Sequence, residues 1–355
     1  MIIISAQDIT NIERKTVNKP EERKQIIKNA LSQYVKELHF EEMTPHQLIV
    51  TYPLLKYVTS EQFLTFLHGA YAHFQIFKDI DLTEPENDGL IPLSIQRVKP
   101  SNDKLSNIPI HLRCGFYAKD LMTPIHEHTY QHVANSIQAT YIGAQSAINN
   151  DMTYILDGTG HHATYEEYGG YCFLNTAVFG ALCLQDGLGY KGKIVILDID
   201  YHHGDGTQDL CQLFGQSHDI HCVSIHMNPM FDYPKHCGYE FENGKYNTNI
   251  TVEPKSDINK YMEKLQIALN KIKEINPYGV VLSIGYDILI DDLDANSLGG
   301  MNIKPDDFKL IAKTISSSLY KINKNMKVLL VQEGGYNLEL IPKASYNFIE
   351  NFKLE

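Results

Sequence analysis

The sequence lacks several features that mark particular classes of protein. Its six cysteines form no C-x-x-C pair and mostly lie within apolar stretches, so a disulfide framework is not expected. No apolar run approaches the length of a transmembrane helix. The apolar run at the amino terminus is short and has no basic leader, unlike a signal peptide. We therefore expect no membrane association and a reduced, cytoplasmic setting.

Basic residues are scarce relative to acidic ones. The chain has 31 Lys and Arg against 43 Asp and Glu, a formal charge of −12. An acidic surface disfavours binding to nucleic acid and favours cationic partners. With 355 residues, of which 43% are apolar and 21% charged, the composition is that of a globular protein with a large core. No linker or internal repeat divides the chain, so we expect one domain over residues 1–355.

Short apolar runs alternate with segments of helical spacing. The apolar runs are residues 154–156, 194–197, 222–225, 280–284 and 328–331. Because they are almost entirely apolar, they are typical of strands covered on both faces in a parallel sheet. The helical segments are 20–38, 124–148, 257–275 and 305–322. This order predicts an α/β fold with a central, mostly parallel sheet flanked by helices. The proline-containing residues 80–112 are predicted to form a long irregular insertion.

Polar side chains follow the apolar runs, where parallel sheets place their active sites. Asp198, Asp200 and His202 occupy alternate positions after the run 194–197. In a continuing strand, a period of two would place the three side chains on one side. Two carboxylates and an imidazole at a strand end have the composition of a metal-ligand set.

The other runs end in the same manner. The adjacent His161 and His162 follow a glycine-rich turn, Asp287 follows the run 280–284, and Tyr336 follows Gly-Gly. Each feature alone has an ordinary structural interpretation, such as a helix cap, a turn or a hydrogen-bonded core histidine. Burying so many charged groups together without pairing or a metal would cost several kcal/mol per group. The combination therefore favours a metal site.

These motifs resemble the histone deacetylase superfamily, most closely its branch of acetylpolyamine amidohydrolases and bacterial deacetylases, which has the arginase-like deacetylase fold. The matching segments are Gly160–Ala163, Gly169–Asn175, Asp198–Gln208, Ser224–His226, Gly285–Asp287 and Glu333–Tyr336. They come in the family order and are dense from about Pro109 to the carboxyl terminus. The resemblance implies a metal-dependent deacetylase, a hydrolase of linear amide C–N bonds.

The resemblance also implies two ion sites. Asp200, His202 and Asp287 would bind the catalytic metal, with Zn²⁺ as the family expectation and Fe²⁺ as an alternative. A structural K⁺ would be held by Asp198, Asp200, His202, Ser224 and Ile225, mostly through main-chain oxygens.

The resemblance assigns catalytic roles to further residues. His161 would pair with Asp198 and His162 with Asp205, because a carboxylate at the second ring nitrogen fixes the tautomer. His162 is expected to act as the general base, and one histidine of the pair would protonate the leaving amine. Tyr336 would donate a hydrogen bond to the tetrahedral oxyanion.

Substrate recognition is the less specific part of the resemblance. Tyr171, with its neighbour Gly170, and Tyr233 would line the tunnel for the substrate's methylene chain, although ordinary structural tyrosines are the alternative. Asp294 stands where polyamine-selective relatives carry an acidic gatekeeper, and Glu127 belongs to a segment that flanks the tunnel mouth. A solvated acidic loop is the alternative for Asp294. An anionic mouth would favour a small, cationic, acetylated amine such as an acetylpolyamine.

Two other functions stay open from the sequence. One is a deacylase acting on acetyl-lysine in proteins, and the other is a catalytically silent metal-binding scaffold. The intact His161, His162 and Tyr336 disfavour the scaffold, which would need none of them. In relatives, a region such as residues 80–112 can build a homodimer contact or narrow the tunnel, and both interpretations stay open here.

Overall fold

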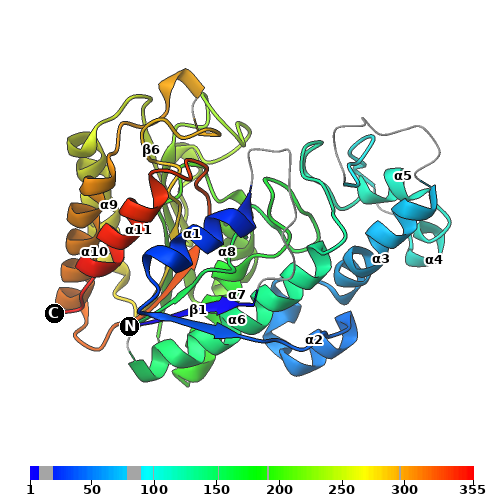
Figure 1. Ribbon diagram of the computed structural model, residues 1–355, viewed down its shortest axis with the longest axis horizontal. Coiled ribbons are helices and arrows are strands. Elements are labelled where there is room, and N and C mark those ends of the chain that lie inside the picture. The colour runs from blue at the N-terminus through cyan, green and yellow to red at the C-terminus, as the bar shows by residue number, and fades with distance from the viewer. Residues whose placement is uncertain (8–18, 78–88, 99, 151, 190–191, 296) are drawn as a thin grey trace.

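The computed structural model describes residues 1–7, 19–77, 89–98, 100–150, 152–189, 192–295 and 297–355 (Figure 1). Within them, eight parallel strands form one sheet in the order β2-β1-β3-β8-β7-β4-β5-β6. The strands are β1 (Ile2–Ala6), β2 (Val35–Leu38), β3 (Met152–Ile155), β4 (Ile194–Asp198), β5 (Ile220–Met227), β6 (Asn247–Val252), β7 (Gly279–Ile284) and β8 (Lys327–Gln332). The predicted α/β class with a parallel sheet is confirmed.

Helices connect the strands and cover the sheet. The α-helices are α1 (Pro20–Ala30), α2 (Pro45–Thr51), α3 (Glu61–Phe77), α4 (Asn102–Leu105), α5 (Ile110–Cys114), α6 (Thr129–Asn150), α7 (Thr176–Gly187), α8 (Asp205–His218), α9 (Ile258–Ile275), α10 (Phe308–Ile322) and α11 (Ile341–Asn351). Short 3₁₀ helices span Pro53–Tyr57, Glu240–Glu242, Ser297–Gly299 and Pro305–Asp307. None of the described helices is long and apolar enough to cross a bilayer.

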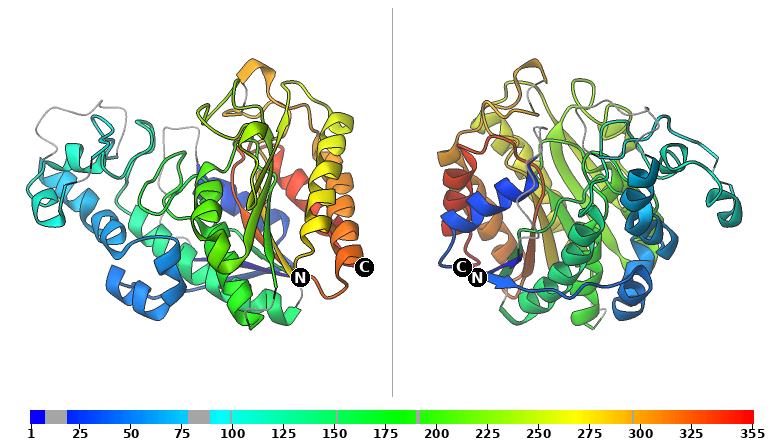
Figure 2. Two further views of the ribbon diagram at one scale, coloured as in Figure 1. Left: turned by 180° about the vertical axis from the view of Figure 1, so that it is seen from behind. Right: turned by 45° about the vertical axis from the view of Figure 1, so that its right-hand side comes forward.

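The sheet separates two apolar cores, and neighbouring residues of one strand enter different cores. Val280 and Leu282 pack with α1, α9, α10 and α11 on one face, whereas Val281 packs with α6, α7 and α8 on the other. Figure 2 shows these helix layers on opposite sides of the strands. Successive strand residues point to opposite faces, so a strand covered on both faces must be apolar throughout. This explains the uninterrupted apolar runs.

Helix α9 illustrates how local sequence sets an element's bounds. The Asp257 carboxylate accepts hydrogen bonds from the Asn259 and Lys260 main-chain N–H groups, which caps the first turn. Tyr261, Leu265, Leu269 and three further residues of the same stripe are buried against the sheet. Asn276 adopts a left-handed conformation with φ of 56° and ends the helix.

Two of the helices are shorter than the sequence predicts. The segment 20–38 was predicted as one helix, but it ends at Ala30 and residues Val35–Leu38 form β2 beside β1. The pairing with β1 satisfies this backbone and overrides the helical spacing. The segment 124–148 was predicted as helical from Pro124, but α6 begins at Thr129. Ile125 is held in an isolated bridge with Leu90, which keeps that stretch extended.

The sequence reasoning missed three strands and part of the insertion's structure. β1 was regarded only as a short apolar run, and β2 and β6 are edge strands that mix polar with apolar residues. Part of the insertion predicted at 80–112 (residues 80–88 and 99) lies outside the described residues. The remainder contains α4 and the start of α5, which project from the body of the molecule with α3 (Figure 1).

Substitution of a buried aromatic in α11 should lower stability strongly. Phe348 is fully buried, with its ring centroid 5.4 Å from that of Phe352 and 6.4 Å from that of Phe308. We expect Phe348→Ala to lower the free energy of unfolding by about 3–5 kcal/mol, because it leaves a cavity. Tyr346→Ala in the same helix is the control, since Tyr346 is 46% exposed. Urea denaturation measures both, and equal losses would contradict this description of the core.

Candidate active site

Two carboxylates and an imidazole meet at the carboxyl edge of the sheet. His202 Nδ1 lies 3.5 Å from Asp200 Oδ1 and 3.3 Å from Asp287 Oδ2. Asp200 and His202 follow β4 and Asp287 follows β7, a neighbouring strand of the sheet. One ligand atom from each residue lies within 4.8 Å of the others, and all three residues are buried. Residues about 86 positions apart in the chain thus form one compact group.

The loop after β4 is shaped by its own carboxylates. The Asp200 N–H donates to Asp198 Oδ1 at 3.1 Å, and the His202 N–H donates to Asp200 Oδ1 at 2.9 Å. The expectation of one strand carrying Asp198, Asp200 and His202 on one side was wrong, because β4 ends at Asp198. These side chain to main chain hydrogen bonds turn the backbone out of the strand.

The donors of this group fit a divalent metal ion. Within the described residues, the buried Asp287 Oδ2 atom has no hydrogen-bond partner. Burial and the nearby Asp200 charge raise the pKa of Asp287 to about 7, as expected of two carboxylates buried side by side. A Cβ on Gly285 would lie 2.2 Å from Asp200 Oδ2, and one on Gly334 would lie 2.2 Å from Asp287 Oδ2. Only glycine leaves room for these carboxylates.

Two other groups of potential ligands occur among the described residues, but their donors are engaged. In the group His161, Cys172 and Glu333, Glu333 Oε2 accepts the Gly160 N–H at 2.6 Å. In the group Asp205, His236 and Cys237, one Asp205 oxygen pairs with His162 and the other with Lys119. Asp200 and Asp287 also accept main-chain N–H groups, but Asp287 Oδ2 has no hydrogen-bond partner in the part of the chain that the structure describes, so the group of Asp200, His202 and Asp287 is the candidate metal site.

His161 is surrounded by carboxylates. Its Nδ1 lies 3.1 Å from Asp198 Oδ2 and its Nε2 lies 3.7 Å from Asp200 Oδ1. Burial alone would lower the pKa of His161, but the charges of Asp200 and Asp198 outweigh it and raise the pKa to about 10. Glu333 Oε2 also accepts the His161 N–H at 3.3 Å. The turn before the histidine pair is thereby tied to the end of β8.

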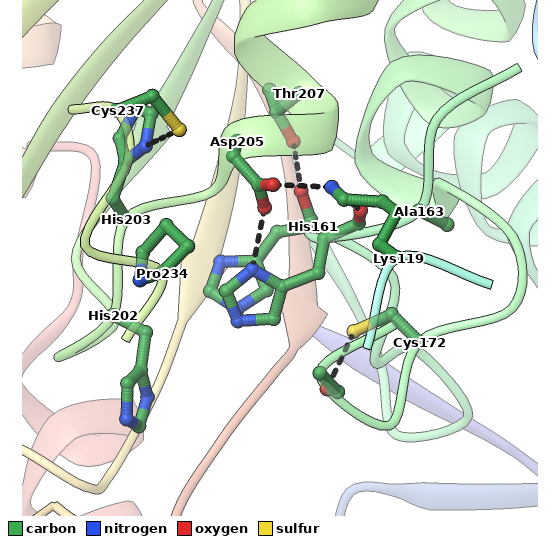
Figure 3. Close-up of polar contacts among 12 residues, drawn as sticks. Lys119, His161, Ala163, Cys172, His202, His203, Asp205, Thr207, Pro234 and Cys237 are labelled. Carbon is green, nitrogen blue, oxygen red and sulfur yellow. Dashed lines mark hydrogen bonds and ion pairs between the residues drawn. The ribbon is translucent and has the colours of Figure 1, made fainter. Parts of the chain in front are cut away.

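His162 has a different environment. Its Nδ1 lies 2.8 Å from Asp205 Oδ1, and Asp205 Oδ2 pairs with the Lys119 ammonium group (Figure 3). Burial and the charge of His161 lower the pKa of His162 to about 3, against the opposing effect of Asp205. The two ring centroids are only 4.0 Å apart. Adjacent histidines therefore favour opposite protonation states.

Tyr336 is positioned by contacts from distant parts of the chain. Its N–H donates to Asp292 Oδ2 at 2.8 Å. The buried Arg23 of α1 donates to the Gly335 carbonyl at 2.9 Å, and its guanidinium lies 5.7 Å from the centre of the Tyr336 ring. Gly335 has a φ of 128°, which a residue with a side chain rarely adopts. The contacts from Asp292 and Arg23 therefore fix the turn after β8 that carries Tyr336.

Several of the residues predicted to bind substrate lie near the metal group. The Tyr233 ring centroid is 4.9 Å from that of His162 and 6.3 Å from that of His202. Gly170, with φ of 54°, packs so closely on His162 that a Cβ would meet the ring at 2.3 Å. Asp294 is mostly buried, and its charge contributes to raising the pKa of Tyr336 after burial itself.

Tyr171 and Glu127 differ in how closely they approach this group. Burial and then the charge of Asp294 raise the pKa of Tyr171 to about 12, so Tyr171 and Asp294 are near each other. Glu127 is exposed in the turn before α6, and no contact brings it to the metal group. Its neighbour His126 and Tyr171 both line a cavity of about 110 Å³ beside α1.

The residues predicted to hold potassium lie on the adjacent strands β4 and β5 or in the loop after β4. Asp198 of β4 is paired with Ser224 of β5 in the parallel register. The Ser224 hydroxyl lies 2.7 Å from His226 Nδ1, so its side chain is engaged within β5. Ile225 is fully buried. The potassium site stays a prediction.

The sequence matches the histone deacetylase domain family over residues 18–352. The chain belongs to this family. It is 28% identical over 312 residues to acetylpolyamine amidohydrolase 2 of Pseudomonas aeruginosa, covering 84% of this chain and 82% of that protein. It is 29% identical over 244 residues to acetylpolyamine amidohydrolase of Burkholderia pseudomallei, covering 64% of each chain.

The fold agrees with that of two solved structures. The crystal structure of acetylpolyamine aminohydrolase from Burkholderia pseudomallei matches with a TM-score of 0.79 and 22% identity, covering 99% of this chain and 98% of that one. The HD domain of HDA15 matches with a TM-score of 0.67, covering 98% and 90%. The predicted family, fold class and assignment as a deacetylase enzyme are confirmed.

Four residues that shape the site were given no role from the sequence. Glu333 stood within a matched motif, so its position was a usable signal. Lys119, Arg23 and Asp292 contact site residues through the fold, with partners 86, 312 and 44 positions away. No local pattern distinguishes them from surface charges.

Removing one carboxylate should abolish metal binding. We expect wild-type protein to retain one divalent ion after dialysis, and Asp287→Ala to retain almost none, because a three-ligand site loses a charged ligand. Elemental analysis by mass spectrometry measures the ion. Asp291→Asn is the control, because Asp291 is an exposed carboxylate four positions away. Equal metal content in wild type and Asp287→Ala would contradict the site.

Proposed function

We propose that the chain is a metal-dependent amidohydrolase that removes acetyl groups from small acetylated polyamines. The observation that carries this proposal is a carboxylate, Asp294, placed beside the candidate metal group. Burial and then the charge of Asp294 raise the pKa of Tyr171 and of Tyr336, so the carboxylate lies near both phenols. A cationic substrate that reaches this group would therefore pass a negative charge.

The relatives support this choice of substrate class. Two of the similar curated proteins are named acetylpolyamine amidohydrolases. A polyamine acetylated at one end keeps an ammonium group at the other, separated by a methylene chain. Such a molecule matches aromatic walls followed by a carboxylate, because the methylenes pack on rings while the ammonium pairs with the charge. The overall charge of −12 also favours a cationic substrate.

Asp200, His202 and Asp287 would hold the metal, for which Zn²⁺ is proposed. When bound, such an ion polarises the acetyl carbonyl and lowers the pKa of a coordinated water. His162 would accept the proton of the attacking water, because burial and the charge of His161 keep its imidazole neutral. His161 would then give a proton to the leaving amine.

Tyr336 would stabilise the negative charge that develops on the acetyl carbonyl oxygen when water attacks the carbon. Burial and the charge of Asp294 keep its pKa well above the ordinary value, so the phenol is protonated and can donate a hydrogen bond. The bond from its N–H to Asp292 and the contact between Arg23 and Gly335 fix the turn that carries it. Because this turn is already fixed, the Tyr336 phenol needs no rearrangement when negative charge develops on the carbonyl oxygen.

Substrate preference tests the proposal directly. We expect higher kcat/KM on N-acetylputrescine or N8-acetylspermidine than on an acetyl-lysine peptide. Asp294→Asn should lower kcat/KM on the polyamines roughly tenfold, about 1.4 kcal/mol, and change the peptide activity little, because only the polyamine carries a distant ammonium. Asp291→Asn serves as the control carboxylate.

Three outcomes would count against the proposed function or change it. Equal losses on both substrate classes in Asp294→Asn would count against a charge-selective mouth. A clear preference for the acetylated peptide would favour the protein deacylase. Activity that survives complete removal of metal by a chelator would refute the metal-dependent mechanism.

The phenol of Tyr336 should affect kcat more than KM. We expect Tyr336→Phe to lower kcat by about 10²–10³-fold, the typical effect of losing one oxyanion donor, and to leave metal content unchanged. The ring remains to pack on Arg23, so the melting temperature should stay near that of wild type. Tyr346→Phe, an exposed residue of α11, is the control. Unchanged kcat in Tyr336→Phe would remove this residue from the mechanism.

A further inference from the structure

A buried lysine contacts the carboxylate that pairs with His162. The Lys119 side chain is only 10% exposed and that of Asp205 only 4%. The Lys119 ammonium donates to the His162 main-chain carbonyl at 2.8 Å and pairs with Asp205 Oδ2. Figure 3 shows it directed at the Asp205 carboxylate. One cation thus contacts both the backbone of the proposed base and the carboxylate that holds its ring.

The two oxygens of Asp205 have different partners. Oδ1 lies 2.8 Å from His162 Nδ1, while Oδ2 pairs with Lys119. A carboxylate bound at one oxygen can rotate, whereas one bound at both is fixed. Lys119 therefore fixes the Asp205 carboxylate, and this carboxylate in turn orients the imidazole of His162.

The backbone around Lys119 is anchored to the same region. The Lys119 N–H donates to the Tyr168 carbonyl at 2.8 Å. The next side chain, Asp120, accepts the Gly170 N–H at 2.6 Å through Oδ2. Gly170 in turn packs against the His162 ring. The pair Lys119–Asp120 thus contacts both the carboxylate behind the His162 ring and the turn that packs on that ring.

We propose that Lys119 is a positioning residue for the deacetylation: its ammonium fixes the Asp205 carboxylate and the His162 backbone, and so aligns the imidazole that accepts the proton. This inference rests on the proposed function. Lys119 touches neither the metal ligands nor the reacting atoms in the described contacts, so it acts through Asp205 and His162. An ion pair that served stability alone would have no need of the additional bond to His162.

Charge balance supports the same role. Burial alone would raise the pKa of Asp205, but the Lys119 charge and the hydrogen bond with His162 hold it below the ordinary value. Asp205 therefore remains an acceptor of hydrogen bonds, which the Nδ1–H tautomer of His162 requires. Other charged or titratable groups near the pair are His161, His202, His203, Asp209, Cys172, Tyr233, His236 and Cys237.

Substitution of Lys119 provides the test. We expect Lys119→Met, which keeps the aliphatic length and removes the charge, to lower kcat on acetylputrescine by roughly 10–100-fold, the usual cost of losing an outer-shell partner. KM and bound metal should stay near wild type, because neither substrate contacts nor metal ligands change. Lys119→Arg, which keeps donors for both oxygens, should recover most of kcat. Lys235→Met, at an exposed lysine of the loop after Tyr233, is the matched control.

A crystal structure of Lys119→Met supplies a readout independent of activity. We expect the distance from His162 Nδ1 to Asp205 to exceed about 3.5 Å, beyond a hydrogen bond. An unchanged geometry with wild-type kcat would overturn the role of Lys119. So would Lys119→Arg with as low a kcat as Lys119→Met, since charge would then not matter. A wild type inactive on every acetylated amine would instead count against the proposed function.

A lower melting temperature than that of wild type would show that Lys119→Met is destabilised. In that case Lys119→Ala assayed with ethylammonium keeps the inference testable, because the small cation can occupy the space of the missing ammonium. An increase of kcat with ethylammonium concentration, absent in wild type, supports positioning by charge. A folded Lys119→Ala protein that shows no such increase would overturn the proposal.

Discussion

The mutual repulsion of buried carboxylates is the constraint on which the site depends. Asp200 and Asp287 are buried and converge on His202, and Asp287 Oδ2 has no hydrogen-bond partner among the described residues. Such an arrangement is unstable unless a cation compensates the charge. The fold supplies the rigidity to hold the carboxylates together, and a bound ion would supply the missing charge. Both are needed for the geometry to persist.

The parallel sheet makes this convergence possible. Strands β4, β7 and β8 are neighbours with a common direction, so the loops after them meet at one edge. Apolar residues fill both faces of each strand and leave polar groups only at the ends. Gly285 and Gly334 then allow the backbone to approach the carboxylates. The parallel sheet therefore both builds the apolar core and brings the metal ligands together at its carboxyl edge.

Sequence reasoning succeeded where the signal was local and failed where it was distant. The central strands and the block from Asp198 to His202 could be found because each is contiguous in the chain. β2 was missed because pairing with β1 overrides its helical spacing. Lys119 was missed because a lysine 86 positions from its partner Asp205 is indistinguishable from a surface charge. Contacts of this kind exist only once the fold has formed.

The two histidines show how the fold can give identical neighbours different roles. His161 faces Asp198, which pairs with no lysine or arginine in the described contacts, and Asp200. His162 faces Asp205, whose charge is shared with Lys119. The imidazole with more negative charge around it favours its protonated form, and the other favours its neutral form. A neutral imidazole can accept a proton and a protonated one can give it. The asymmetry of charge around the pair therefore supports His162 as base and His161 as acid.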